Sequence, residues 1–284
     1  MYRLVVENER GDTLTLTGNR NFAIDYLDGF YSSAAAISTS KIGTRDGEKV
    51  SARTINKKNI GIYLKILQDV TNNRIDLYRI FQAKKKVTIY YTNPVREVKI
   101  EGYVESVTIA PHQQMSTAQM IILCPSPFFE GVDEIVRSLS TVVSNFTFPF
   151  SIEDSGMAFS FVKEETQINI HNYGEVDAGM IIEAKAIGEV INPMLYDENS
   201  RILGVGTSEV PYVMKEGEII TFDTENKTVK STKNLVTTNI FNYLRPNSVW
   251  FKLRPGDNII GSGALEGNKN LKVTIRHRDK YEGV

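Results

Sequence analysis

The chain has 284 residues, of which 41% are hydrophobic and 24% are charged, with 33 basic and 34 acidic side chains. This composition indicates a folded protein of about two domains and excludes a globally disordered chain. The net charge of −1 argues against the broad basic surface that tight nucleic-acid binding requires. The single cysteine, Cys124, excludes an internal disulfide, so we expect folding in a reducing compartment.

The sequence shows neither an export signal nor a membrane-spanning segment. Its first residues lack an apolar stretch followed by a cleavage site, and no window approaches 18 uncharged apolar residues. We therefore expect no signal peptide and no membrane insertion.

Short strand patterns separated by turns dominate the first 130 residues. Residues 2–7 and 13–16 predict a hairpin, and apolar residues alternate along residues 59–67 as on a half-buried strand. The clearest helix is predicted over residues 71–82, where Thr71 or Asn72 would cap the free amides. Further strands are predicted at residues 87–91, 98–109 and 118–123.

Residues 38–53 interrupt this pattern with a polar, glycine-containing stretch that has few core-type side chains. A loop of this length is unusual inside a compact domain, and such loops are often binding arms. Two interpretations stay open: a mobile surface hairpin, or an arm that binds another protein. The candidate interface residues of the arm are Gly43, Arg45, Asp46, Gly47 and Arg53.

A junction follows the first domain and occupies residues 131–147. Ile135, Val136 and Leu139 match a helical period, but the β-branched content equally favours an extended connector. Both alternatives stay open. We place the domain boundary near Glu130, which gives domains over residues 1–130 and 131–284.

The second domain reads as a series of short antiparallel strands. Turn residues separate them, including a hairpin loop at residues 223–227 and a Pro-Gly turn at residues 255–258. With almost no helix, the pattern predicts a β-sandwich or jelly roll. The strands are expected at residues 167–170, 179–186, 218–223, 228–231, 248–253 and 271–277.

The sequence lacks the residue patterns of an active site. The three histidines, His112, His171 and His277, do not stand beside a Ser or Cys in a nucleophile motif, and Gly-x-Ser-x-Gly is absent. His277, between two arginines in a predicted strand, is expected to be solvated. No metal-ligand spacing and no phosphate-binding loop are found. We therefore predict a protein that is not an enzyme and has no cofactor and no metal.

Three local features each allow a purely structural and a functional interpretation. Residues 197–199 fit a plain turn better than a weak cation site, and the lysine run 84–86 fits a solvated loop that guards a strand edge. Trp250, the only tryptophan, is expected in the core. An exposed Trp250 could instead stack on a sugar ring, so it is the candidate carbohydrate contact.

Several segments resemble, in their order along the chain, the distal tail (Dit) family of long-tailed, non-contractile bacteriophages and of prophages in Gram-positive bacteria. The most telling is Cys124-Pro125-Ser126-Pro127-Phe128-Phe129, which closes the first domain. The match covers nearly the whole chain. The other matching segments are residues 26–29, 43–47, 77–81, 100–105, 148–150, 172–179, 192–193, 242–246, 250–258 and 281–284.

The resemblance implies a mainly β protein. The first domain would be a β-sandwich or barrel-like domain with one helix and an extended arm, and the second a galectin-like, jelly-roll β-sandwich. The first domain would form a hexameric ring in which each arm belts its neighbour. The ring would join the tail tube to the tail-tip and receptor-binding proteins, and DNA would pass through it without being read.

The resemblance also implies a location in the virion tail after synthesis in the cytoplasm of the bacterial host. Galectins bind sugar through a set of His, Asn, Arg and Trp residues. That set is not found in order here, because His171-Asn172-Tyr173 lacks the arginine. The alternative function is a carbohydrate-binding module of the host-adhesion device. A glycan hydrolase would need two carboxylates across a cleft, and no adjacent pair can provide them.

Overall fold

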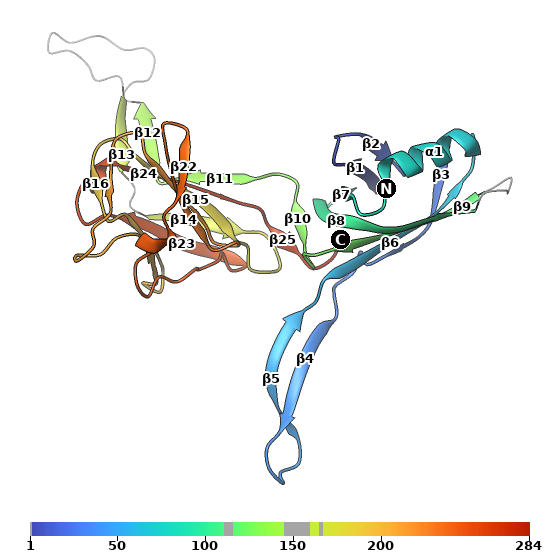
Figure 1. Ribbon diagram of the computed structural model, residues 1–284, viewed down its shortest axis with the longest axis horizontal. Coiled ribbons are helices and arrows are strands. Elements are labelled where there is room, and N and C mark those ends of the chain that lie inside the picture. The colour runs from blue at the N-terminus through green and yellow to red at the C-terminus, as the bar shows by residue number, and fades with distance from the viewer. Residues whose placement is uncertain (1, 111–115, 145–159, 165–166) are drawn as a thin grey trace. The chain divides into compact units, whose positions relative to one another are not determined.

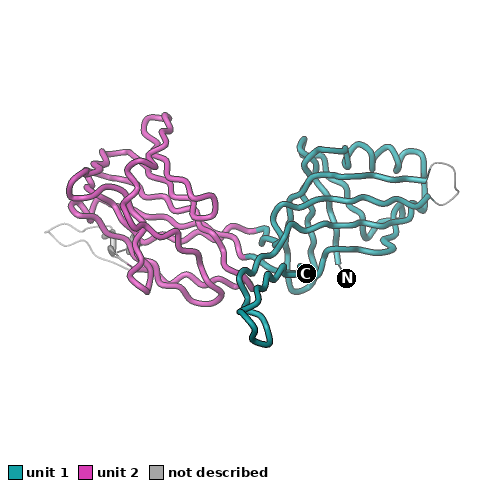
Figure 2. Tube along the Cα trace, turned by 60° about the horizontal axis from the view of Figure 1, so that its bottom comes forward, with its two compact units in different colours: residues 1–132, 280–284 teal, residues 133–279 magenta. Residues whose placement is uncertain are grey.

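The computed structural model describes residues 2–110, 116–144, 160–164 and 167–284. The chain divides into two compact units: unit 1 is residues 1–132 with 280–284, and unit 2 is residues 133–279 (Figure 2). Both are built almost entirely of antiparallel strands, which confirms the predicted mainly β class (Figure 1). Among the described residues, no helix has the length and apolar character that a membrane crossing requires.

Unit 1 is organised around one nine-stranded sheet in which the order β2-β1-β7-β8-β9-β6-β3 is continued by β10 beside β8 and by β25 beside β10. Alternate side chains of β6 and β9 enter the core, as the period-2 pattern predicts. The strands are β1 (Arg3–Asn8), β2 (Thr13–Thr15), β3 (Phe22–Asp28), β6 (Lys58–Ile66), β7 (Lys86–Thr92), β8 (Glu97–Ile109), β9 (Ser116–Cys124), β10 (Phe129–Gly131) and β25 (Lys280–Tyr281). A separate two-stranded sheet pairs β4 (Ala35–Lys41) with β5 (Glu48–Ile55).

The helix α1 (Val70–Ile80) contacts β1, β2 and β6 and buries Leu77 and Ile80 in the core of unit 1. Its predicted cap was wrong. The capping position is Asp69, which has a left-handed backbone (φ 40°), and the Asn72 side chain donates to the Asp69 carboxylate. Because this left-handed turn starts the helix at Val70, Thr71 and Asn72 lie inside the first turn.

Unit 2 contains a six-stranded sheet of order β11-β24-β15-β20-β21-β22 and a four-stranded sheet of order β14-β23-β17-β18. Side chains from both sheets share one core, for example Ile182 and Phe222 from the first sheet and Ile170 and Ile260 from the second. This is the arrangement of a β-sandwich. The first sheet comprises β11 (Ile135–Ser138), β15 (Met180–Ala186), β20 (Ile219–Asp223), β21 (Thr228–Lys233), β22 (Val236–Asn239) and β24 (Leu271–His277); the second comprises β14 (Gln167–Asn172), β17 (Met194–Asp197), β18 (Ile202–Gly204) and β23 (Gly256–Gly263).

Shorter elements complete unit 2. Two small sheets pair β12 (Ser140–Ser144) with β13 (Ser160–Glu164), and β16 (Val190–Ile191) with β19 (Val213–Met214). Two 3₁₀ turns are η1 (Phe241–Tyr243) and η2 (Asn268–Asn270). The strands β11 and β12 lie in the predicted junction, where the extended alternative therefore holds. His112 and residues 148–150 lie outside the described residues.

The strand predicted at residues 248–253 is not formed. Asn247 has a left-handed backbone (φ 64°), and the Phe251 N–H bonds to the Val249 carbonyl, so the chain turns tightly there. Only Leu253 makes an isolated bridge, to Ala178. The aromatic and β-branched composition predicted a strand, but the preceding turn redirects the backbone.

His277 is buried, which contradicts the solvated position that its flanking arginines suggested. It lies on the same inward face of β24 as Val273 and Ile275. Strand alternation explains the error: if Arg276 and Arg278 point outward, the residue between them points inward. Within the part of the chain that the structure describes, neither ring nitrogen has a partner at hydrogen-bond geometry.

Candidate functional site

The predicted polar arm is a regular antiparallel hairpin, not an irregular loop. The strands β4 and β5 pair from Ala35 opposite Ile55 to Lys41 opposite Glu48, with a bulge between Ser38 and Thr39. No other strand of the described residues pairs with either of them, and Figure 1 shows the hairpin projecting from the sheet of unit 1. Its sequence is polar because both faces meet solvent, which hid the strand periodicity.

The arm exposes several apolar side chains to solvent in the isolated subunit. Ile37, Ile42 and Val50 are 60%, 50% and 48% exposed. An isolated two-stranded hairpin is only marginally stable in water, and both of its edges offer unpaired N–H and C=O groups. The arm is therefore suited to binding along the surface of another protein, where its apolar side chains would be covered.

The structure gathers four of the five predicted arm residues at the hairpin tip. Gly43 (φ 55°) and Gly47 (φ 91°) make the two left-handed turns between which Arg45 and Asp46 lie. The Arg45 N–H bonds to the Ile42 carbonyl at 3.3 Å. Arg53 is separate from them, on β5 opposite Ile37.

Trp250 packs against the core of unit 2 and is half-buried. Its ring stacks on Phe241, with 6.5 Å between the centroids and 12° between the planes. Near this pair, a groove of about 440 Å³ is lined by Thr207, Ser208, Glu209, Val210, Asn242, Tyr243, Leu244 and Pro246. Tyr243 is 44% exposed and packs edge-on against Tyr212, with 5.1 Å between centroids. The groove thus combines a braced aromatic ring with hydroxyl, amide and carboxylate groups.

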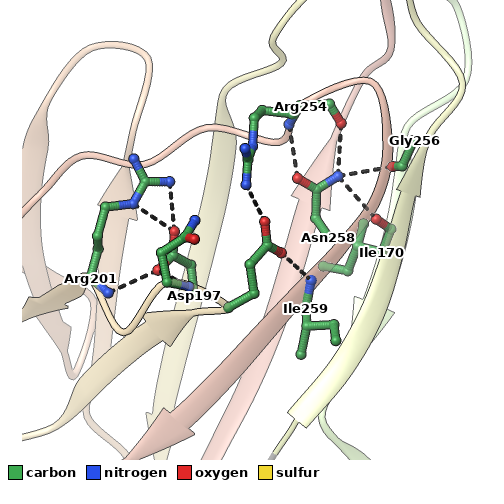
Figure 3. Close-up of polar contacts among 9 residues, drawn as sticks. Ile170, Asp197, Arg201, Arg254, Gly256, Asn258 and Ile259 are labelled. Carbon is green, nitrogen blue, oxygen red and sulfur yellow. Dashed lines mark hydrogen bonds and ion pairs between the residues drawn. The ribbon is translucent and has the colours of Figure 1, made fainter.

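Two loops of the four-stranded sheet are joined by polar side chains (Figure 3). The Asp197 carboxylate accepts the backbone N–H groups of Asn199 and Arg201 and an ion pair from the Arg201 guanidinium at 2.6 Å. Burial raises the pKa of Asp197, but the hydrogen bonds and charge of Arg201 outweigh it and lower that pKa overall. Glu198 and Asn199 form the turn that follows β17, which agrees with the predicted turn at residues 197–199.

The second loop is held by Asn258 and Glu198. The Asn258 side chain accepts the Arg254 N–H at 2.9 Å and donates to the Arg254 carbonyl at 2.8 Å, while Glu198 pairs with Arg254. The carboxylates here are occupied by protein partners. Among the described residues, no group of three or more His, Cys, Asp or Glu side chains is placed to hold a metal.

One histidine–carboxylate pair lies on the surface of the same sheet. His171 Nδ1 lies 2.9 Å from Asp257 Oδ1, and Asn169 donates to the same oxygen. The hydrogen bonds of His171 and Asn169 lower the pKa of Asp257. The pair is a cross-strand contact between β14 and β23, where His171 stands opposite Asp257.

Comparison with known proteins gives one family and a set of similar folds. Residues 173–281 match the family described as siphovirus-type tail component, C-terminal domain. The Dit protein of phage SPP1, described as a paradigm of the hub adsorption apparatus in phages that infect Gram-positive bacteria, superimposes with a TM-score of 0.67 at 15% identity over 99% of both chains. No curated protein matches the sequence significantly.

The phage P2 baseplate in its activated conformation contains a second similar chain. With calcium, it superimposes with a TM-score of 0.52 at 12% identity over the full length of both chains. At these identities the two solved structures show a common fold, and the family match comes from unit 2.

Proposed function

Because residues 173–281 match the siphovirus-type tail component family and the whole chain has a fold similar to that of the Dit protein of phage SPP1, we propose that it is a structural hub of a non-contractile phage tail. Six copies form a ring that joins the tail tube to the tail-tip and receptor-binding proteins. DNA passes through the ring without being read. The protein acts in the virion tail and catalyses no reaction.

The arm is the observation that supports this proposal most strongly. A closed ring requires a heterologous interface, in which one patch of a subunit meets a different patch of the next. A projecting hairpin with exposed Ile37, Ile42 and Val50 and two open edges is such a patch. In this proposal, the domain of residues 1–130 forms the ring through the tip residues 43–47 and Arg53. The domain of residues 131–284 remains free for other partners.

Replacing the three apolar arm residues together, Ile37→Ser, Ile42→Ser and Val50→Ser, is expected to abolish ring formation. Covering each aliphatic side chain contributes on the order of 1–2 kcal/mol, so the triple variant is expected to weaken self-association at least about a hundredfold. Light scattering behind size-exclusion chromatography, together with negative-stain microscopy, measures the change. The fold is expected to persist, since all three side chains are exposed.

A second exposed hairpin provides the matched control. Leu235 and Val236, at the β21–β22 turn, are 100% and 67% exposed. The variant Leu235→Ser, Val236→Ser removes similar apolar area from another tip and is expected to leave the ring intact. The proposal fails if the arm variant assembles as the parent does, or if the parent stays monomeric at every accessible concentration and with its tail partners.

Carbohydrate binding is a second candidate function, supported by the groove beside Tyr243. An aromatic ring next to hydroxyl and amide groups is suited to stacking and hydrogen bonding with a sugar. Tyr243→Ala is then expected to lower retention on host cell-wall polysaccharide at least about tenfold, which corresponds to the loss of one good stacking contact. Tyr243→Phe, which keeps the ring, is the control, and Trp250→Ala tests the predicted contact. Equal retention of all variants would rule out this function.

A further inference from the structure

The base of the arm is built around one buried lysine. Lys58 is the first residue of β6 and stands three residues after the end of β5, so it marks the point where the chain returns from the arm. It is only 4% exposed. Its ammonium group donates to the Tyr31 carbonyl and to the Glu282 carbonyl, both at 2.8 Å. Tyr31 precedes the arm, so this single group joins the two chain segments that enter and leave it.

The second carbonyl belongs to a segment from the other end of the sequence. Residues 281–284 lie against the segment that enters the arm: the Val284 N–H bonds to the Phe30 carbonyl at 3.1 Å, and the Ser32 hydroxyl donates to the Glu282 carboxylate at 2.6 Å. Arg96 also contacts this segment. Its guanidinium lies over the Tyr281 ring, 4.5 Å from the centroid, and donates to the Gly283 carbonyl at 3.2 Å.

Burial disfavours the charged form of the Lys58 ammonium group. Burial lowers its pKa, and the negative charge of Glu282 offsets part of this. Cys124 provides no thiolate, because burial raises the pKa of its thiol to about 12. The ammonium lies 4.8 Å from the centroid of the Phe129 ring, so a cation–π contact and two carbonyls hold the charge. A methionine would fill the same space without the cost of burying a charge. The advantage of a lysine here is therefore its hydrogen bonds to the Tyr31 and Glu282 carbonyls.

We propose that Lys58 is the positioning residue of the arm. Its ammonium ties the segments entering and leaving the hairpin to residues 281–284 and thereby fixes the direction in which the arm leaves the sheet. This inference rests on the proposed function, since a direction matters only if the arm binds a neighbour. A hairpin held in its binding direction loses less freedom when it docks, so it binds more tightly than one free to swing.

The test compares Lys58→Met with Lys65→Met in the full-length protein. Both residues lie on β6, but Lys65 is surface-exposed and pairs with Asp25. In Lys58→Met we expect faster amide hydrogen exchange at residues 30–35 and 55–57 and self-association weakened at least about tenfold. Exchange in the strands of unit 2 should not change. Lys65→Met is expected to match the parent in all three measurements.

Unchanged exchange around the arm base together with parental assembly in Lys58→Met would overturn the inference. If Lys58→Met does not fold, Glu282→Ala removes the hydrogen bond to Ser32 and the negative charge near Lys58 but keeps the backbone carbonyl that Lys58 contacts. It should shift both measurements in the same direction by a smaller amount; no shift would overturn the inference as well. If the parent itself does not assemble, the proposed function fails, and the exchange comparison alone decides the role of Lys58.

Discussion

Replacing Gly29 with alanine is expected to destabilise unit 1 by at least about 3 kcal/mol. Gly29 has a positive φ of 77°, and a Cβ placed there would lie 2.1 Å from the Asn59 carbonyl oxygen and 3.2 Å from the Ile60 Cα. Those atoms are backbone of β6, which is paired with both β3 and β9, so they cannot move aside without breaking the sheet. The expected loss therefore combines backbone strain with a steric clash at the turn that leads to the arm.

Gly18→Ala separates these two contributions. Gly18 has nearly the same backbone (φ 72°), but no atom lies within 4 Å of a Cβ placed there. Its substitution is expected to cost only the strain of about 1–2 kcal/mol. Urea unfolding followed by hydrogen exchange at β6 and β9 measures both variants in unit 1. Equal losses for the two variants would show that the contact between Gly29 and β6 is unimportant.

Much of the fold could be predicted from the sequence because half-buried strands alternate. Residues 59–67 and 118–123 place every second side chain in the core, as do residues 98–104 before a bulge shifts the register of β8, and the corresponding β6, β8 and β9 form as predicted. The helix was predicted in the same way, from the helical spacing of its apolar residues. Its start was misplaced because the left-handed conformation of Asp69 is set by how the chain leaves β6, which no local pattern shows.

The arm shows where such reasoning stops. The period of apolar residues in a sequence indicates which side chains are buried. Because β4 and β5 bury almost none, their sequence shows no strand period, and a loop was predicted in place of a regular hairpin. The predicted tip residues do lie together, because Gly43 and Gly47 carried a turn signal that does not depend on burial. The turn at the tip could thus be predicted from its glycines, but the pairing of β4 with β5 could not.

Lys58 was missed, although a signal was present. It shares its parity with Ile60, Ile62, Leu64 and Ile66, so extending the predicted strand by one residue places it on the buried face. What the sequence could not supply is its partners. Residues 280–284 were assigned to the second domain, yet they belong to unit 1, where Lys280 and Tyr281 pair with β10. The contact between Lys58 and Glu282, which are 224 positions apart, has no signal in the local sequence.

Replacing His277 with leucine is expected to stabilise unit 2 by about 1–3 kcal/mol, because neither buried ring nitrogen makes a well-formed hydrogen bond to any described residue. His277 is 3% exposed, and its nearest acidic oxygen, Asp279 Oδ1, lies 3.6 Å from Nε2. Burial lowers the pKa of His277. The charge of Arg137 lowers it further, and Asp279 and the His171 backbone offset part of the shift. The imidazole is therefore neutral in the folded protein at pH 7.

The same residue predicts the direction of a pH dependence. In the unfolded chain the His277 pKa returns to its ordinary value of about 6.5, so below that pH the unfolded state binds more protons than the folded state. The free energy of unfolding of unit 2 should therefore fall as the pH drops from about 6.5 through the lower pKa of the folded state, and this contribution should level off below it. Above pH 7, His277 makes no contribution to the pH dependence.

Urea denaturation of the parent and of His277→Leu between pH 5 and pH 8 tests this, with hydrogen exchange in β15 and β24 reporting on unit 2. The variant should lose most of the acid-dependent decrease, so its advantage over the parent grows as the pH falls. His171→Gln is the comparison variant, because it removes a surface histidine of the same unit and leaves His277 in place, so the decrease that His277 causes should remain. A His277→Leu variant that is less stable than the parent, or equally sensitive to acid, would mean that the buried imidazole is accommodated without cost.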